Sequence, residues 1–202
     1  MNIEKRRYRM VARADAAKRT GRAIIDAAAE LFWERDPDEI TLDAIAARAG
    51  VTLQTILRRF GTKDAVFAAA AEVKSAEVAR SREPERPGDR AAAMRALFAS
   101  YEQMGAVNWR LLRFEHQGGA LHQILVDARA SHRDWVARTF AEVLPRRGAE
   151  RERRIDALFT ATDFYVWKLS RQDLGRSRAD TEANMLLLVD ALVRRFGEEK
   201  DA

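Results

Sequence analysis

The sequence contains no cysteine, which excludes several kinds of site at once. Without thiols there is no disulfide framework, no thiolate metal site and no cysteine nucleophile, and we expect a cytoplasmic protein. The 202 residues include only 4 prolines and 10 glycines. Because Ala, Leu, Glu and Arg dominate the remainder, we predict an all-α fold.

Long apolar runs are also missing. No uncharged run approaches the roughly 18 residues that a membrane span needs, and the N-terminus lacks the apolar core of a secretory signal. Hydrophobic residues make up 47% of the chain and charged residues 33%, which is typical of a globular protein. We therefore expect no membrane partner.

Catalytic constellations are absent from the sequence too. It has no glycine-rich phosphate loop after a strand and no Ser-His-Asp order on a strand, turn and helix. The three histidines are His116, His122 and His132, and the first two lack the i, i+4 spacing of a helical metal pair. We predict no catalytic residues, no metal and no cofactor.

The stretch from residue 40 to residue 60, ITLDAIAARAGVTLQTILRRF, has the signals of two short helices joined by a tight turn. Thr41 and Thr52 are favourable N-cap residues, one for each helix. Gly50 tolerates the left-handed backbone that a sharp turn requires. The apolar residues between these signals recur at helical spacing. This pattern predicts a helix-turn-helix motif, with a plain helical hairpin as the alternative.

The outward face of the second helix carries side chains that suit base recognition. If Ile56 faces inward, Leu53, Gln54, Leu57 and Arg58 face outward, because residues four apart share a face. Arg can bond guanine, Gln can bond adenine, and Leu can contact a thymine methyl group.

Positive charge is concentrated near the N-terminus. Residues 1–63 hold thirteen Lys or Arg and nine Asp or Glu, so they carry most of the net charge of +5. Such an excess is typical of a surface that contacts phosphate. We interpret residues 1–19 as a basic arm that lies along or in the minor groove, or else as a solvated disordered tail.

The run from Ile24 to Phe67 resembles the DNA-binding domain of the TetR family of bacterial transcriptional repressors. The resemblance lies in IIDAAAELFWERD, TLDAIAARAGV and FGTKDAVF, three segments in the same order and spacing. In the last of these, Lys63 stands at a helix N-terminus, where it suits a phosphate contact or simply accompanies a capped helix. We predict that DNA is contacted by Thr41, Thr52, Leu53, Gln54, Thr55, Leu57, Arg58, Arg59 and Lys63.

The sequence also departs from the family pattern. Asp36 and Pro37 stand where the family usually has Gly and an aromatic residue. Leu57 and Arg59 replace the usual Tyr and His that touch phosphates. Leu57 cannot hydrogen-bond a phosphate, whereas Arg59 offers a charged contact in place of a neutral one.

Patterns that predict helices continue through the rest of the chain, interrupted by the Pro- and Gly-containing stretch 81–90. We predict three domains: the arm at 1–19, a three-helix helix-turn-helix DNA-binding domain at 20–67, and a helical ligand-binding and dimerisation domain at 68–202. Outside the motif, helices are predicted at 20–35, 64–80, 89–107, 108–117, 120–144, 150–173 and 177–196, the last opened by a capping box at Ser177.

Apolar residues cover most of the circumference of the last helix, as in MLLLV from 185 to 189. That stripe is too wide for a one-sided surface helix, so a second surface must cover it. The alternatives are a homodimer and the central helix of a monomer. The resemblance implies a dimer in which the last two helices of each chain form a four-helix bundle.

Aromatic and Met side chains recur on several helices of the C-terminal domain, where apolar spaces can hold ligands. The alternative is an ordinary hydrophobic core. The resemblance implies a small-molecule effector that releases DNA. Our candidate ligand-binding residues are Phe98, Tyr101, Met104, Trp109, Phe114, Trp135, Phe159 and Asp163.

These features together predict a dimeric repressor that binds a palindromic operator in double-stranded DNA and leaves it when the effector binds. One alternative is an architectural or non-specific DNA-binding protein. Another is a helical enzyme or ligand carrier that has an incidental helix-turn-helix.

Overall fold

The computed structural model describes residues 3–82 and 89–201, with side chains from residue 10 to residue 198 outside that gap. Every regular element in these ranges is helical, and the ranges contain no strand. The all-α prediction is therefore confirmed. Within the same ranges no helix has both the length and the apolar character that crossing a bilayer requires.

The chain divides into two compact units. Unit 1 comprises residues 1–77 and 106–125, and unit 2 comprises residues 78–105 and 126–202. This division differs from the predicted boundary after residue 67, because the segment 106–125 folds with the N-terminal helices. The reason is long-range packing, which composition along the chain does not reveal. The assignment of functions to the two parts stays a prediction.

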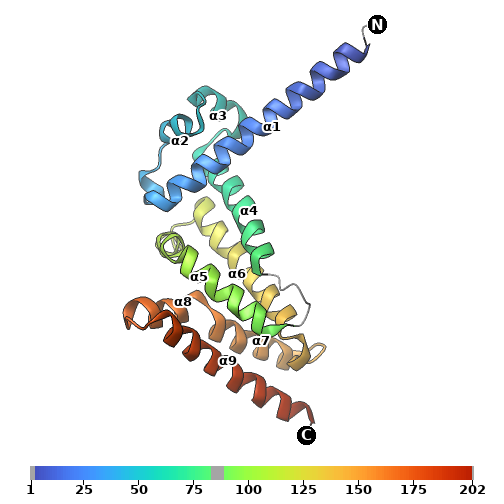
Figure 1. Cartoon of the computed structure of the whole chain (residues 1–202), viewed down its shortest axis with the longest axis vertical. Helices are drawn as coiled ribbons and strands as arrows, with labels where there is room; N and C mark the ends of the chain where they lie inside the picture. The colour runs from blue at the N-terminus through green and yellow to red at the C-terminus, as the bar shows by residue number, and fades with distance from the viewer. Residues whose placement is uncertain (1–2, 83–88, 202) are drawn as a thin grey trace. The chain divides into compact units, whose positions relative to one another are not determined.

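Unit 1 is built on α1 (Ile3–Glu34), the long helix drawn in blue in Figure 1. It continues with the 3-10 turn η1 (Pro37–Glu39), α2 (Leu42–Ala49), α3 (Leu53–Phe60) and the first part of α4 (Lys63–Arg82). The core of the unit is one apolar cluster formed by Ile24, Ala28, Leu31, Phe32, Ile40, Ile45, Ile56, Val66 and Phe67. Each large member stabilises the unit by about 1.5–3 kcal/mol through burial.

We predicted that the first helix begins near Thr20, and this was wrong: α1 begins at Ile3. Neither Pro nor Gly occurs between these residues, so nothing in the sequence stops the helix from extending toward the N-terminus. Residues 10–19 are exposed throughout. Figure 1 shows this half of α1 extending beyond α2 and α3. The predicted arm is therefore helical where it is described, and its contact with DNA stays a prediction.

The remaining helices lie in unit 2, except that the end of α5 (Arg90–Leu112) and the start of α6 (Gly119–Thr139) belong to unit 1. Helix α5 is continuous, whereas we predicted two helices that meet at Asn108. No helix-breaking residue lies at that position, and the break comes after Leu112. The other elements are η2 (Ala141–Val143), α7 (Ala149–Thr162), α8 (Phe164–Lys168), the π-helical turn η3 (Leu169–Asp173) and α9 (Arg178–Asp201).

The predicted helix at 150–173 is interrupted once, between α7 and α8. Asp163 takes an extended conformation (φ −71°, ψ 152°), and its carboxylate accepts a hydrogen bond from the Tyr165 N–H at 2.8 Å. Asp163 therefore caps a new helix and does not continue the old one. At the start of α9, Ser177 Oγ accepts from the Asp180 N–H at 3.1 Å, which confirms the predicted cap.

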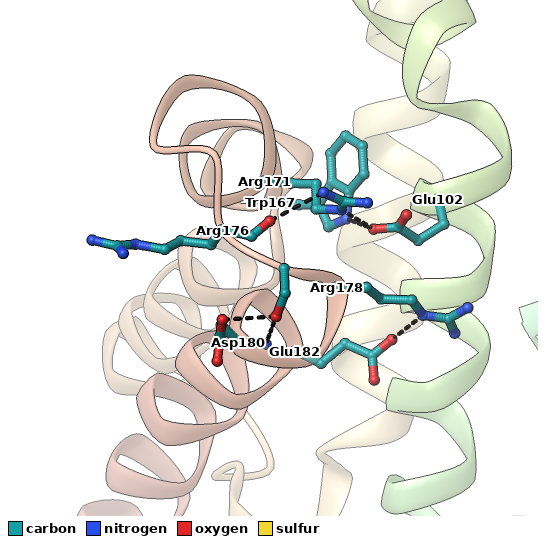
Figure 2. A network of polar contacts seen from close by, with 8 residues as sticks. Glu102, Trp167, Arg171, Arg176, Arg178, Asp180 and Glu182 are labelled. Atoms are coloured by element: carbon teal, nitrogen blue, oxygen red, sulfur yellow. Dashed lines mark hydrogen bonds and ion pairs between the residues drawn. The ribbon is translucent and has the colours of Figure 1, made fainter.

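A polar network joins α5 to the turn that precedes α9. Figure 2 shows Glu102 accepting hydrogen bonds from Trp167 Nε1 at 3.2 Å and from Arg171 Nε at 3.0 Å. The Trp167 ring packs directly on Gly105, where an added Cβ would lie 2.6 Å from the ring. Only glycine leaves room for the indole there. This network fixes η3 and the end of α8 against α5.

Candidate nucleic-acid interface

Local hydrogen bonds define the turn between α2 and α3 as the sequence predicts. Thr41 Oγ1 accepts from the Ala44 N–H at 3.1 Å, and Thr52 Oγ1 accepts from the Thr55 N–H at 3.2 Å. Gly50 ends α2 with φ 65° and ψ 34°. A side chain with a Cβ would be strained in this left-handed conformation. The helix-turn-helix is therefore set by two hydroxyl caps and one glycine.

The two faces of α3 differ sharply. Ile56 is fully buried in the core of unit 1, whereas Gln54 and Arg58 are exposed and Leu57 keeps 38% of its surface accessible. Leu53 is half-buried. The outward orientation predicted for Gln54, Leu57 and Arg58 agrees with the structure, whereas Leu53 is only partly exposed. Their contact with bases stays a prediction.

The hydroxyl groups predicted to contact DNA already take part in caps. Thr52 Oγ1 and Thr55 Oγ1 lie 2.9 Å apart, so one donates to the other. Thr41 Oγ1 uses an acceptor position for its cap and keeps its O–H as a donor. An N-capping hydroxyl that also donates to phosphate would hold the helix and the DNA backbone with the same atom.

Arg59 lies against α1 and does not extend straight outward. A Cβ built on Gly21 of α1 would fall 2.2 Å from Arg59 Nη2, so the guanidinium occupies the space that a side chain would need. Arg59 Cζ also lies 5.8 Å from the centre of the Phe60 ring. Gly21 is therefore the residue that admits Arg59 to this position, a pairing that the sequence did not reveal.

Lys63 has an internal role that we did not predict. Its ammonium group donates to the backbone carbonyls of Ile40, at 2.9 Å, and Pro37, at 3.3 Å. It also lies 5.3 Å from the centre of the Phe67 ring. An ammonium has three N–H donors, so one remains for a phosphate. Lys63 thus holds the segment before α2, and its contact with DNA stays a prediction.

Arg48, the basic residue of α2, is held by acidic groups of α1. Its guanidinium donates to both carboxylate oxygens of Glu34, at 2.9 and 2.7 Å, and to Glu30 at 3.3 Å. The hydrogen bond from Arg48 holds the pKa of Glu34 below its usual range. This pairing fixes α2 to α1 and neutralises the charge of Arg48. Positive charge on the outer face of the motif therefore comes mainly from α3.

The end of α1 is capped by residues distant in sequence. Arg110 Nη1 donates to the carbonyl oxygens of Phe32, at 2.6 Å, and Trp33, at 2.8 Å, which α1 leaves unpaired at its C-terminus. Arg113 forms an ion pair with Asp36 just beyond it. No local sequence pattern marks these partners. The ion pair with Arg113 explains why Asp is favourable at position 36, where the TetR family usually has Gly.

The eight candidate ligand-binding residues belong to both units. Trp109 and Phe114 belong to unit 1, and Trp109 is 42% exposed. The other six lie in unit 2, where Phe98 and Tyr101 are buried and Asp163 caps α8. Trp135 and Phe159 flank the same ring, that of His132, at centroid distances of 5.3 and 5.0 Å. A shared ligand for the whole set stays a prediction.

Residues 24–70 match the family model described as bacterial regulatory proteins of the tetR family. These residues form a TetR-family N-terminal domain. The matched residues run from the buried part of α1 through the helix-turn-helix into α4, which are the elements that form the core of unit 1.

Curated relatives of the chain include an HTH-type transcriptional repressor of Mycobacterium tuberculosis and an HTH-type transcriptional regulator of Mycobacterium bovis. Each is 37% identical to it over 67 residues. The match spans 33% of the chain and about a third of the length of these relatives, 36%. It therefore concerns one part of each protein.

Solved structures resemble a much larger part of the chain. A tetR-family transcriptional regulator from Streptomyces coelicolor superposes with a TM-score of 0.68 and 21% identity, covering 89% of this chain and 88% of that one. SmeT, the repressor of a multidrug efflux pump of Stenotrophomonas maltophilia, gives 0.58 and 18%, covering 87% and 89%. At these identities the likeness establishes the fold alone.

Proposed function

We propose that the protein is a transcriptional repressor that reads DNA bases with α3. The observation that carries this proposal is the outer face of α3, where Gln54, Leu57 and Arg58 are exposed on a helix capped at both ends. Among the residues described on α3 none is acidic, so nothing there repels phosphate. Arg and Gln are the side chains that bond guanine and adenine edges in the major groove. Repression is supported by the related repressor of M. tuberculosis.

The repressor would act as a homodimer through α9 and the helices beside it. Leu187 and Leu188 on α9 are 66% and 47% exposed, while Met185 and Val189 on its other side are buried within unit 2. Leu169 and Leu174 before α9 are exposed as well. An apolar surface of this kind is typical of a protein interface. A two-fold dimer would present two copies of α3 to a palindromic operator.

A small molecule bound in unit 2 would release the operator. SmeT, of similar fold, has been solved in complex with triclosan, which supports a small-molecule effector for this protein. The effector would favour a conformation of the dimer in which the two copies of α3 fit the operator half-sites poorly. Because linkage is reciprocal, bound operator would weaken the binding of the effector by the same factor.

The exposed first half of α1 would add a phosphate contact that does not depend on sequence. Arg13, Lys18 and Arg19 are exposed there. Deleting residues 1–18 would then weaken DNA binding and flatten its dependence on salt, because fewer counterions are released. An unchanged salt slope would contradict this phosphate contact.

In vitro selection from a random duplex pool, at near-physiological salt and with the full chain, tests the proposal. A consensus with two-fold symmetry is expected for a dimeric reader of operators. Enrichment without a consensus would instead establish the architectural alternative. A failure to enrich any duplex, repeated after the protein has been unfolded and refolded to remove bound small molecules, would contradict DNA binding itself.

A further inference from the structure

The interior of unit 2 contains a group of polar side chains from four helices, which we call the inner polar cluster: Arg82, Ser100, Tyr101, His132 and Thr162. Tyr101 connects its members, because its O–H donates to the Thr162 carbonyl at 2.9 Å and its ring lies 5.3 Å from Arg82 Cζ. Thr162 can offer this carbonyl because α7 ends there. The cluster therefore surrounds the break between α7 and α8.

Arg82 is the charged member, and its partners in the described part of the chain are neutral. Its Nε and Nη2 donate to one hydroxyl oxygen, Ser100 Oγ, at 3.2 and 2.9 Å. It forms no ion pair with any carboxylate of residues 10–82 or 89–198. Burial lowers the pKa of Arg82, which reflects the cost of a charge removed from water. Of its five N–H groups, three have no acceptor among the described residues.

His132 has a buried ring nitrogen, Nδ1, without a hydrogen-bond donor among the described residues. The Thr162 hydroxyl donates to the Leu158 carbonyl at 2.8 Å, so its oxygen accepts from His132 Nε2–H at 3.0 Å. Burial, and then the charge of Arg82, lower the pKa of His132 to about 3, so the ring is neutral. With its proton on Nε2, Nδ1 is an acceptor that has no donor among the described residues. A buried acceptor left unpaired is unfavourable.

Flat rings enclose His132 on two sides. The Trp135 indole stacks on the imidazole at 5.3 Å with an interplanar angle of 12°, and Phe159 meets it edge-on at 5.0 Å. The indole Nε1–H of Trp135 is buried and also lacks an acceptor within the described residues. A cation, an unpaired acceptor, an unpaired donor and aromatic rings therefore lie in the same part of unit 2.

We infer that the effector of unit 2 is a small hydroxycarboxylate with an apolar, aromatic body. Its carboxylate pairs with Arg82, and its hydroxyl bonds His132 Nδ1. A carboxylate fits the guanidinium fork, which can donate two parallel bonds to it. A hydroxyl both donates and accepts, so it can satisfy His132 Nδ1 and Trp135 Nε1 together. A single cation matches a singly charged ligand better than a phosphate dianion. This inference rests on the proposed effector site and names its chemistry.

The test is calorimetric titration of the full chain, without DNA, with matched probes. The probes are benzoate, its three monohydroxy isomers and the corresponding neutral benzamides, so charge and hydroxyl position vary separately. At least one hydroxybenzoate is expected to bind about tenfold or more tightly than its amide, because a bond to a charged group is the stronger kind. Equal binding of acid and amide would overturn the inference. Absence of binding by every acid would do so too, and would assign the unmatched atoms to buried water.

Two variants separate the two contacts. Arg82→Gln should remove the preference for acid over amide, whereas Arg80→Gln, an exposed neighbour on the same helix, should keep it. His132→Phe retains the stacked ring and should keep the acid preference while losing the preference for a hydroxyl. Circular dichroism of each variant separates lost binding from lost folding. If Arg82→Gln disrupts the fold, Arg82→Lys keeps the charge but not the fork, and it should show a reduced acid preference.

Because these titrations contain no DNA, they fail independently of the proposed function. A chain that selects a palindrome yet binds no hydroxybenzoate would refute the hydroxycarboxylate and leave the repressor intact. A chain that binds hydroxybenzoates through Arg82 but selects no DNA would support the hydroxycarboxylate and refute the repressor.

Discussion

The guanidinium of Arg59 on α3 occupies the space beside Gly21 on α1, at a distance that leaves no room for a Cβ. The contact joins the reading helix to the long first helix. It also holds a flexible, charged side chain in one place before any DNA is bound. An arginine fixed in advance loses less side-chain entropy when it pairs with phosphate.

Gly21→Ala should therefore change DNA binding without harming the fold. Alanine favours the helix by up to about 1 kcal/mol, and the displaced group is the mobile end of Arg59. Operator affinity should fall by about 0.5–1.5 kcal/mol, the cost of ordering one long side chain. Fluorescence anisotropy over a range of salt concentrations measures both affinity and salt slope.

Arg59→Gln is the matched comparison for that variant. Removing the charge should lower the salt slope by about one unit, whereas Gly21→Ala should leave the slope unchanged. The same slope for wild type and Arg59→Gln would show that Arg59 makes no phosphate contact.

Lys63→Met should destabilise unit 1, because it leaves the carbonyls of Ile40 and Pro37 without their donor. Hydrogen bonds that involve a charged group contribute about 1.5–3 kcal/mol, so urea unfolding should show a loss of about that size. Arg58→Gln, which changes an exposed side chain, is the control and should leave stability unchanged. A Lys63→Met protein as stable as wild type would contradict the internal role.

Acid should weaken the fold through His132. Its pKa in the folded protein is about 3, because of burial and then the charge of Arg82, whereas an unfolded histidine titrates near 6.5. Between these values the unfolded chain binds the additional proton, so stability falls as the pH falls, by at most about 1.4 kcal/mol per unit.

Urea unfolding between pH 4 and pH 7 checks this slope. Replacing His132 by Phe should flatten the dependence, while replacing the exposed His116 by Gln should not. Parallel curves for wild type and the His132 variant would mean that the imidazole is not held neutral by the fold.

The exposed leucines of α9 give a direct test of the dimer. Wild type should sediment at micromolar concentration as twice the chain mass of 22.9 kDa. The combined change Leu187→Glu and Leu188→Glu should yield monomers, because it would bury two charges without partners. Val126→Glu, at an apolar residue of α6 that is 40% exposed, should leave the dimer intact. A monomeric wild type would remove dimerisation from the account.

The sequence was most informative where structure depends on local chemistry. Thr41, Gly50 and Thr52 each act within one turn of the chain, and their caps and left-handed backbone follow from residue type alone. The division between inner and outer faces of α3 follows from helical periodicity in the same way.

Sequence reasoning was least reliable where no residue marks a boundary or where partners are far apart. The start of α1 was missed because no Pro or Gly between residues 3 and 20 marks it, and the continuity of α5 was missed because helical spacing does not show that one helix runs through Asn108. The roles of Lys63, Arg110 and Gly21 depend on atoms brought close only by the fold, so no spacing could indicate them. The sequence also did not show that the predicted ligand-binding residues belong to both units, because the division depends on packing between distant segments.

The central claim is that two copies of α3 read bases symmetrically, and parallel selection with wild type and Arg58→Gln tests it most directly. We predict a two-fold symmetric consensus for wild type. The variant should lose discrimination, by about 1–3 kcal/mol, at one base pair and at its symmetry mate in the other half-site. An identical consensus for both proteins, or a preference lost in only one half-site, would contradict the account.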